Sequence, residues 1–326
     1  MNFIFIFFIV AIASCSSKSS HEDKVNSADL PTKSDTSYVW TKLLDSADWK
    51  KSYNFEMFSI QDTLWVFHFD GNWFSTDGIN WTKSQLPNSI TNLAFLDYVQ
   101  FKDAIYGLGN FEGNIEKHTF KNEIYKTTDL QEWTTIANAK GSNLPNRFFY
   151  HPFVYAEKIW IIGGEDKNMQ YSDIWNSTNA IEWKLQKDNL PFSMRSNNQV
   201  VFLNGKLFLL GNDVWSSTDG LHWEKETDEI VKGEEIFGYA AEVFDNKIWL
   251  LGCNRNGQFS SQVLVSSDGK SWRGIDAPWS PRGGIAATVY KGKTYMTGGK
   301  YGGTPSHPEF RYCNDVWTLE KKVVVR

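Results

Sequence analysis

The chain has 326 residues, of which 41% are hydrophobic and 22% are charged, and its formal net charge is −5 at pH 7. This mild acidity argues against nucleic acid as the natural partner, because proteins that bind nucleic acids usually carry a basic footprint. One short apolar run lies at the N-terminus, and no second run of bilayer-spanning length follows it. No CxxC or His-rich spacing indicates a metal site, so we expect neither a metal nor a cofactor.

The N-terminal segment, residues 1–14, is apolar and ends in small residues before Cys15. The stretch Ile12-Ala13-Ser14-Cys15 resembles a bacterial lipobox, in which a peptidase cuts before the cysteine and the cysteine carries the lipid. An ordinary cleaved secretion signal with an incidental cysteine is the alternative. The resemblance implies a lipoprotein of the bacterial cell envelope. Ser16 lacks the acidic signal associated with inner-membrane retention, so we expect the outer membrane, facing either the periplasm or the exterior.

The next segment, residues 15–37, begins with the lipidation site Cys15 and is polar, mixed in charge and free of aromatic residues. It cannot bury enough apolar surface to fold, so we expect a disordered tether. Residues 38–326 are long enough for a single large all-β domain.

A hairpin motif is repeated along this domain, as in "NWFSTDGINW" at 72–81, "NDVWSSTDGLHW" at 212–223 and "SQVLVSSDGKSW" at 261–272. In each copy a Trp follows the turn Asp by four positions. The Asp accepts hydrogen bonds from the turn backbone, and the Gly adopts a positive φ. A further aromatic column lies in short apolar strands such as "KIWIIGG" and "KLFLLG". Together these columns define a unit of four strands, a to d, that repeats about every 46 residues, a typical period for propeller blades.

The segment 38–44, "YVWTKLL", matches "INWTKSQL" and "LHWEKET" but has no turn before it. Six b strands and six c strands are present, whereas only five d strands follow a c strand. We therefore expect 38–44 to be strand d of the last blade, closing the ring and protecting its sheet edges. The Val-rich C-terminal end either extends strand c or pairs where the N-terminal strand closes the ring.

Several of these motifs resemble known propellers. "NDVW", the pairs Gly163-Gly164 and Gly298-Gly299, and "PRGG" at 281–284 resemble kelch repeats and the central domain of galactose oxidase. The hairpin is similar to the Asp-box of sialidase-type propellers. Both resemblances imply a six-bladed β-propeller of four-stranded blades, in which the repeated hairpin is structural and its Trp packs between neighbouring blades.

Function is expected where the repeat is broken. The b–c and d–a loops share one face of such a ring, and the longest b–c loops are 111–120 and 300–313. Trp49 and Trp279 lie in d–a connections, outside the three Trp columns. They either stack on a glycan or anchor a partner protein, or they cover the core of a blade.

Three arginines, Arg147, Arg195 and Arg282, share one repeat position at the start of strand a. Arg side chains there suit an anionic ligand at the mouth of the central channel. The structural alternative is that each pairs with an acid on the next blade, such as Glu234 or Glu235. The resemblance to kelch repeats favours this alternative.

Catalytic motifs are sparse. The histidines have no context that matches the copper site of galactose oxidase, and the early Arg-Ile-Pro segment of sialidases is missing. Kelch-like sialic acid mutarotases need little beyond an Arg and an acid or base, so that activity stays open. Whether Cys253 and Cys313 form a disulfide is also open.

The sequence therefore predicts a lipid-anchored, monomeric propeller of the envelope that binds a glycan or a partner protein without catalysis, through the b–c/d–a loop face. The alternative is an enzyme on acidic sugars, either a sialidase-like hydrolase or a mutarotase, that uses the arginine cluster.

Overall fold

The computed structural model describes residues 34–53, 55–84, 96–109, 111–113, 118–120, 123–137, 141–144 and 146–325. The predicted signal segment, Cys15 and most of the predicted tether lie outside these residues. Ser37–Lys322 form one compact unit. Within the described part of the chain, no helix has the length and apolar character needed to cross a membrane.

The described strands form six main antiparallel sheets, which are the blades. Blades 1 and 2 consist of β2 (Glu56–Ile60), β3 (Thr63–His68), β4 (Gly71–Ser75) and β5 (Thr82–Lys83), then β6 (Asp97–Phe101), β7 (Ala104–Leu108), β10 (Ile124–Thr127) and β11 (Thr134–Ala137). Blades 3 and 4 consist of β12 (Phe153–Tyr155), β13 (Lys158–Ile162), β14 (Ile174–Ser177) and β15 (Trp183–Lys187), then β16 (Gln199–Leu203), β17 (Lys206–Leu210), β18 (Val214–Ser217) and β19 (Glu224–Thr227). Blades 5 and 6 consist of β21 (Ala240–Phe244), β22 (Lys247–Leu251), β25 (Gln262–Ser266) and β26 (Arg273–Asp276), then β27 (Gly283–Tyr290), β28 (Lys293–Tyr301), β30 (Val316–Val325) and β1 (Ser34–Leu44).

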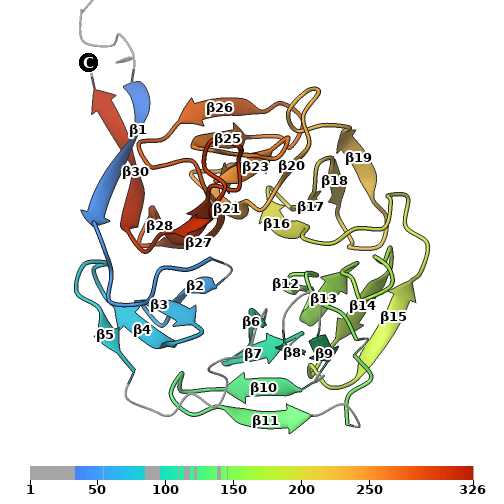
Figure 1. Ribbon diagram of the computed structural model, residues 1–326. Coiled ribbons are helices and arrows are strands. Elements are labelled where there is room, and N and C mark those ends of the chain that lie inside the picture. The colour runs from blue at the N-terminus through green and yellow to red at the C-terminus, as the bar shows by residue number, and fades with distance from the viewer. Residues whose placement is uncertain are drawn as a thin grey trace, which may run out of the picture. The chain divides into compact units, whose positions relative to one another are not determined.

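The six blades follow one another around a ring, with the first strand of each blade innermost (Figure 1). Six hydrophobic clusters hold the ring together, and each is shared by two neighbouring blades. The cluster between blades 6 and 1, which contains Tyr295 and Trp73, closes the circle. The six-bladed β-propeller predicted from the repeats is therefore confirmed.

The N-terminal strand closes the last blade, as the sequence predicts. The order in this sheet is β1-β30-β28-β27, so β1 is the outermost strand of blade 6. It begins at Ser34, ahead of the predicted start at Tyr38. The Val-rich C-terminal end continues β30, the third strand of the blade, to Val325.

The repeated hairpin has the structural role predicted for it. In the copy around Asp219, the carboxylate oxygen Oδ1 accepts hydrogen bonds from the backbone N–H groups of Leu221 and His222, both at 2.8 Å. Gly220 has a φ of 78°, and the indole N–H of Trp223 donates to its carbonyl at 3.1 Å. These bonds satisfy the turn backbone locally and fix the Trp ring in the cluster between blades 3 and 4.

The b–c loops are uneven, as predicted. Two blades have tight turns, whereas blade 2 carries the hairpin β8 (Phe111–Gly113) and β9 (His118–Phe120). In blade 5, β23 (Cys253–Arg255) pairs with both β20 (Ile236–Phe237) and β24 (Gln258–Ser260), and in blade 6, β29 (Arg311–Tyr312) pairs with β28. These additions lie on the face where each innermost strand begins, because the d–a connections arrive there.

Candidate functional site

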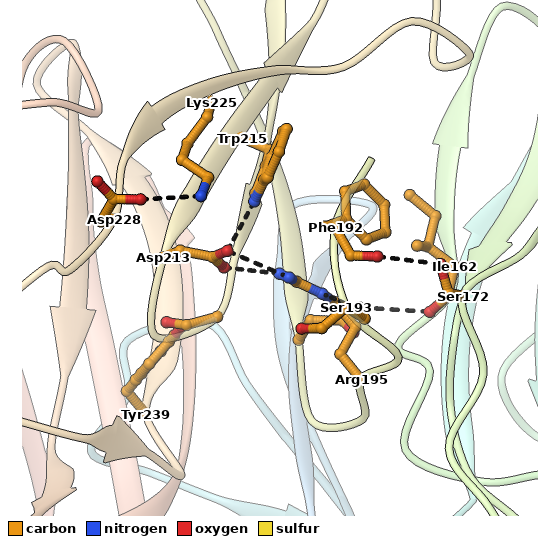
Figure 2. A network of polar contacts seen from close by, with 12 residues as sticks. Ile162, Ser172, Phe192, Ser193, Arg195, Asp213, Trp215, Lys225, Asp228 and Tyr239 are labelled. Carbon is orange, nitrogen blue, oxygen red and sulfur yellow. Dashed lines mark hydrogen bonds and ion pairs between the residues drawn. The ribbon is translucent and has the colours of Figure 1, made fainter. Parts of the chain in front are cut away.

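The three arginines of the shared repeat position are all held in ion pairs. Figure 2 shows Arg195, whose Nη1 and Nη2 donate to the two carboxylate oxygens of Asp213 at 2.7 and 3.2 Å. The indole N–H of Trp215 donates to the same carboxylate at 2.7 Å (Figure 2). Blades 3 and 6 repeat this arrangement with the pairs Arg147–Asp173 and Arg282–Asp315.

The acid in each pair directly precedes strand c of the same blade and does not come from the next blade. The predicted partner Glu234 instead binds Arg255, with Nη2–Oε1 at 2.7 Å. Arg147, Arg195 and Arg282 are all more than nine-tenths buried. Their charges are neutralised, and the guanidinium groups also donate to backbone carbonyls such as that of Gly163. This arrangement favours the structural alternative for the arginines, and an anion-binding role for them stays a prediction.

The two tryptophans outside the repeat columns are also inside the fold. Trp49 is 1% exposed and Trp279 is 4% exposed, so neither presents a ring to solvent. Trp279 packs edge-to-face on Trp40 with ring centroids 4.1 Å apart, and Trp49 packs in the same way on Trp81 at 4.9 Å. Of the two alternatives for these tryptophans, the structure favours the one in which they cover the core, because both rings extend the hydrophobic clusters between blades; a ligand-binding role for them stays a prediction.

The cysteine question is settled for the described residues: Cys253 and Cys313 are both free thiols. Cys253 is buried, and burial raises the pKa of its thiol to about 11. A thiol with such a pKa is a weak nucleophile at neutral pH.

A cavity of about 280 Å³ occupies the centre of the ring, at the end where the innermost strands begin. All six blades contribute to its lining. Its titratable side chains are Glu56 of β2, Asp97 and Tyr98 of β6, His151 just before β12, and Tyr239 and Glu242 at β21. The lining contains no Lys or Arg, so its carboxylates give the cavity an acidic character.

Glu56, Asp97 and His151 lie at one level of this cavity because they occupy the same position of three consecutive repeats, the fourth residue after the arginine column. The sheet registers show the equivalence. The paired residues on strand b are Glu56 with Phe67, Asp97 with Leu108, Gln199 with Leu210, Ala240 with Leu251, and Ala286 with Thr297. Blades 1 to 4 therefore have polar residues at this level, whereas blades 5 and 6 have alanines, of which Ala240 lines the cavity.

The three charged groups of this level are close together. His151 Nδ1 lies 3.3 Å from Asp97 Oδ1. Burial raises the pKa of Glu56 to about 7. Burial alone would lower the pKa of His151, but the carboxylates of Asp97 and Glu56 together outweigh it and the pKa is raised.

Glu242 of β21 lies two residues beyond Ala240, the residue of blade 5 at this level. Burial raises its pKa to about 8, and the carboxylate of Glu56 adds to the rise. At neutral pH this carboxyl group is protonated and can donate a hydrogen bond or a proton within the cavity.

The backbone around His151 is fixed by the neighbouring blade. Phe149 and His151 have φ values of 58° and 41°, which non-glycine residues rarely adopt. The carbonyl of Phe149 accepts a hydrogen bond from the N–H of Asn197 at 2.9 Å, which ties the entry of blade 3 to that of blade 4. The surrounding structure therefore holds His151 at the cavity in a conformation that the chain would otherwise avoid.

These residues were not predicted from the sequence, although the sequence contains a signal for them. Polar side chains at a position that reads Ala in blades 5 and 6 break the repeat inside the channel. The predicted site residues lie instead in the d–a connections at the rim and in the arginine column.

Comparisons with known proteins add support for the fold. No protein-family model matches the sequence, and no curated protein matches it. Among solved structures, the chain is similar to the structure of YjhT, with a TM-score of 0.67 and 11% sequence identity, over 86% of this chain and 99% of that chain. At this identity the likeness supports the shared fold alone.

Proposed function

We propose that this protein is a binding module for a small polar molecule, and that the ligand occupies the central cavity on the b–c/d–a loop face. The observation that carries the proposal is the convergence of Glu56, Asp97 and His151 from three blades at one level of this cavity. A concave site with a few convergent polar groups and shifted pKa values is the usual form of a small-molecule site. Because the polar groups lie inside a cavity, a small molecule suits the site better than the surface of a partner protein.

The charge of the cavity selects the ligand class. Three carboxyl groups line it, and no lysine or arginine side chain does. A neutral or cationic sugar therefore fits better than an acidic one. The volume of about 280 Å³ suits a ligand below drug size, such as one sugar unit.

The test is a calorimetric titration with a neutral hexose, an amino sugar and sialic acid. We expect binding of the hexose or the amino sugar and none of sialic acid. Glu242→Lys places a positive charge in the cavity and should weaken binding of the amino sugar at least about 30-fold, whereas Glu224→Lys, on the exposed face of β19, should leave it unchanged. Binding of sialic acid alone, or equal affinity of Glu242→Lys and the wild type, would contradict the proposal.

A second candidate is an enzyme that opens or hydrolyses a sugar ring, and the protonated carboxyl of Glu242 favours it. A carboxyl group with a pKa of about 8 is a suitable general acid at neutral pH. An enzyme would lose turnover of the bound sugar in Glu242→Gln while keeping affinity. A module without catalysis shows no turnover in either protein, which nuclear magnetic resonance of the two anomers measures directly.

We further propose that the propeller is anchored to the bacterial envelope through a lipid on Cys15. The support is the lipobox-like stretch before this cysteine and the polar segment after it. Two or three acyl chains on one cysteine give stable anchoring. Metabolic labelling with an alkyne fatty acid should mark the wild-type protein and leave Cys15→Ala unlabelled; equal labelling of both would contradict the anchor.

A further inference from the structure

The level that unites Glu56, Asp97 and His151 has the donor set of a metal site. One ligand atom from each of these side chains lies within 4.8 Å of the other two. The three residues come from the innermost strands or strand entries of consecutive blades, so rigid sheets position them. Within the described part of the chain, this is the group of His, Cys, Asp and Glu side chains that can hold a metal ion.

Asp97 supplies a second observation. Its side chain is nine-tenths buried, and its Oδ2 has no hydrogen-bond partner among the described residues. Its other carboxylate oxygen, Oδ1, faces His151 Nδ1. A buried carboxylate oxygen without a partner is costly, because desolvation is not compensated. A cation between the three side chains would provide that missing interaction.

The rest of the level supports a cation with a free coordination position. The amide of Gln199 is already used, since it donates to the carbonyl of Tyr239 and accepts from the N–H of Ala241, both at 2.7 Å. Ala240, the residue of blade 5 at this level, lines the cavity with a small side chain and so leaves space in it. No Lys or Arg in the cavity lining competes with a cation.

We propose that Glu56, Asp97 and His151 bind one divalent transition-metal ion, with zinc as the best match, and leave a position open to the cavity. One imidazole and two carboxylates form a mixed nitrogen and oxygen set, which suits zinc or its neighbours better than calcium, which prefers six to eight oxygen ligands. Three protein ligands with an open position are typical of zinc sites that bind a further molecule. Donor atoms on one tetrahedral zinc lie roughly 3.3 Å apart, so the side chains must close slightly around the ion.

This inference goes beyond the proposed function, because it holds whether or not the cavity binds a sugar. It differs from the expectation of no metal, which rested on sequence spacing: Glu56 and Asp97 are 41 positions apart, and Asp97 and His151 are 54 positions apart, so no local motif reveals them. Their equivalence becomes visible only when the repeats are superposed.

The test begins with full-length protein dialysed against EDTA and titrated with zinc chloride by calorimetry. We expect one zinc ion per chain. Asp97→Asn, His151→Asn and Glu56→Gln should each weaken zinc binding at least about 100-fold, because each removes a ligand. The matched controls His307→Asn and Glu224→Gln change exposed residues outside the cavity and should keep the wild-type affinity. Less than a tenth of an ion per chain, or full affinity in His151→Asn, would overturn the proposal.

A second measurement needs no variant to fold. Cobalt(II) added to the metal-free wild type should give the visible bands of a four- or five-coordinate site without a thiolate charge-transfer band. A thiolate band would assign the metal to a cysteine, and an unchanged aqueous cobalt spectrum would show that no such site forms; either result overturns the proposal. Calcium in place of zinc should compete poorly, and preferential binding of calcium would refute the assignment to a transition metal.

The sugar titration, repeated with EDTA and with zinc, separates the two proposals. Sugar binding in EDTA together with a failed zinc titration leaves the binding module standing and removes the metal. Zinc binding without any sugar binding does the reverse.

Discussion

The guanidinium of Arg147 and the carboxylate of Asp173 form a two-point ion pair inside blade 3, with Nη1–Oδ1 at 2.6 Å and Nη2–Oδ2 at 3.1 Å. Arg147 is 3% exposed and Asp173 is 9% exposed. The indole N–H of Trp175 donates to the same carboxylate at 2.8 Å, so the pair also orients a ring of the blade. The geometry is that of a structural tie between strand a and strand c.

We expect Arg147→Ala to lower the free energy of unfolding by about 3 to 5 kcal/mol, because it leaves the Asp173 carboxylate buried and unpaired. The double variant Arg147→Ala/Asp173→Ala should recover part of this loss. Urea unfolding of the four proteins in the cycle measures the coupling. Arg273→Ala, an exposed arginine on β26, serves as the control and should cost little.

An anion site would give a different pattern. In that case Arg147→Ala would abolish binding of an acidic ligand while the stability stayed near that of the wild type. A loss of stability with unchanged ligand binding supports the ion pair as a tie.

The repeats made the fold predictable. The partners of the candidate site residues could not be predicted, because they depend on contacts between side chains that the repeat pattern does not show. Blades 1 to 5 each carry the hairpin between strands c and d, and the last blade lacks it, so the number of blades and the closing role of 38–44 follow from aligning the copies. The partner of Arg195 could not be read in this way, because Asp213 and Glu234 are both acids near the same face. Only the chain path shows that Asp213 reaches the guanidinium.

The repeats also do not show which loop side chains are exposed to solvent. Trp49 and Trp279 lie in loops that the topology places at the rim, and loop residues are usually exposed. Their rings turn inward because a propeller with uneven blade connections needs apolar groups to cover the ends of its hydrophobic clusters. A residue's place along the chain does not determine the direction of its side chain.

The burial of Trp279 leads to a prediction. Its ring packs between Trp40 and Trp317, and its indole nitrogen has no hydrogen-bond partner among the described residues. Trp279→Phe should therefore cost only about 1 to 2 kcal/mol of stability, and Trp279→Ala about 3 to 5 kcal/mol. Thermal unfolding measures both. Sugar affinity should be the same in the wild type and Trp279→Phe; a loss of affinity there would show that the ring contacts the ligand.

The turn of the repeated hairpin can be tested in the same way. Asp219 holds the backbone of Leu221 and His222 through one oxygen, and blade 3 uses Asn179 in the equivalent role, with bonds of 3.0 and 2.9 Å. Asp219→Asn should keep this acceptor and change the stability by less than about 0.5 kcal/mol, whereas Asp219→Ala should cost about 1 to 2 kcal/mol. Equal losses for the two variants, measured by urea unfolding, would mean that the charge rather than the acceptor matters.

Glu242 predicts how stability depends on pH in the metal-free protein. Its pKa is about 8 in the folded state, above the ordinary value of 4.5. Between these two pH values the folded state binds a proton that the unfolded chain has lost, so the free energy of unfolding falls as pH rises. The stabilisation is fully present below pH 4.5 and is lost as the pH rises through 8.

Glu242→Gln keeps a neutral polar side chain at all pH values, so its stability should fall less steeply from pH 5 to pH 9. The difference between variant and wild type should change over this range by on the order of 2 to 4 kcal/mol in favour of the variant. Glu56, Asp97 and His151 also face this cavity and are unchanged in the variant, so the comparison reports Glu242 together with its coupling to the carboxylate of Glu56. Urea unfolding in EDTA at several pH values is the measurement, with Glu224→Gln as the control. Parallel curves for Glu242→Gln and the wild type would show that the carboxyl of Glu242 is solvated and ionised at neutral pH, and would remove it as a proton donor.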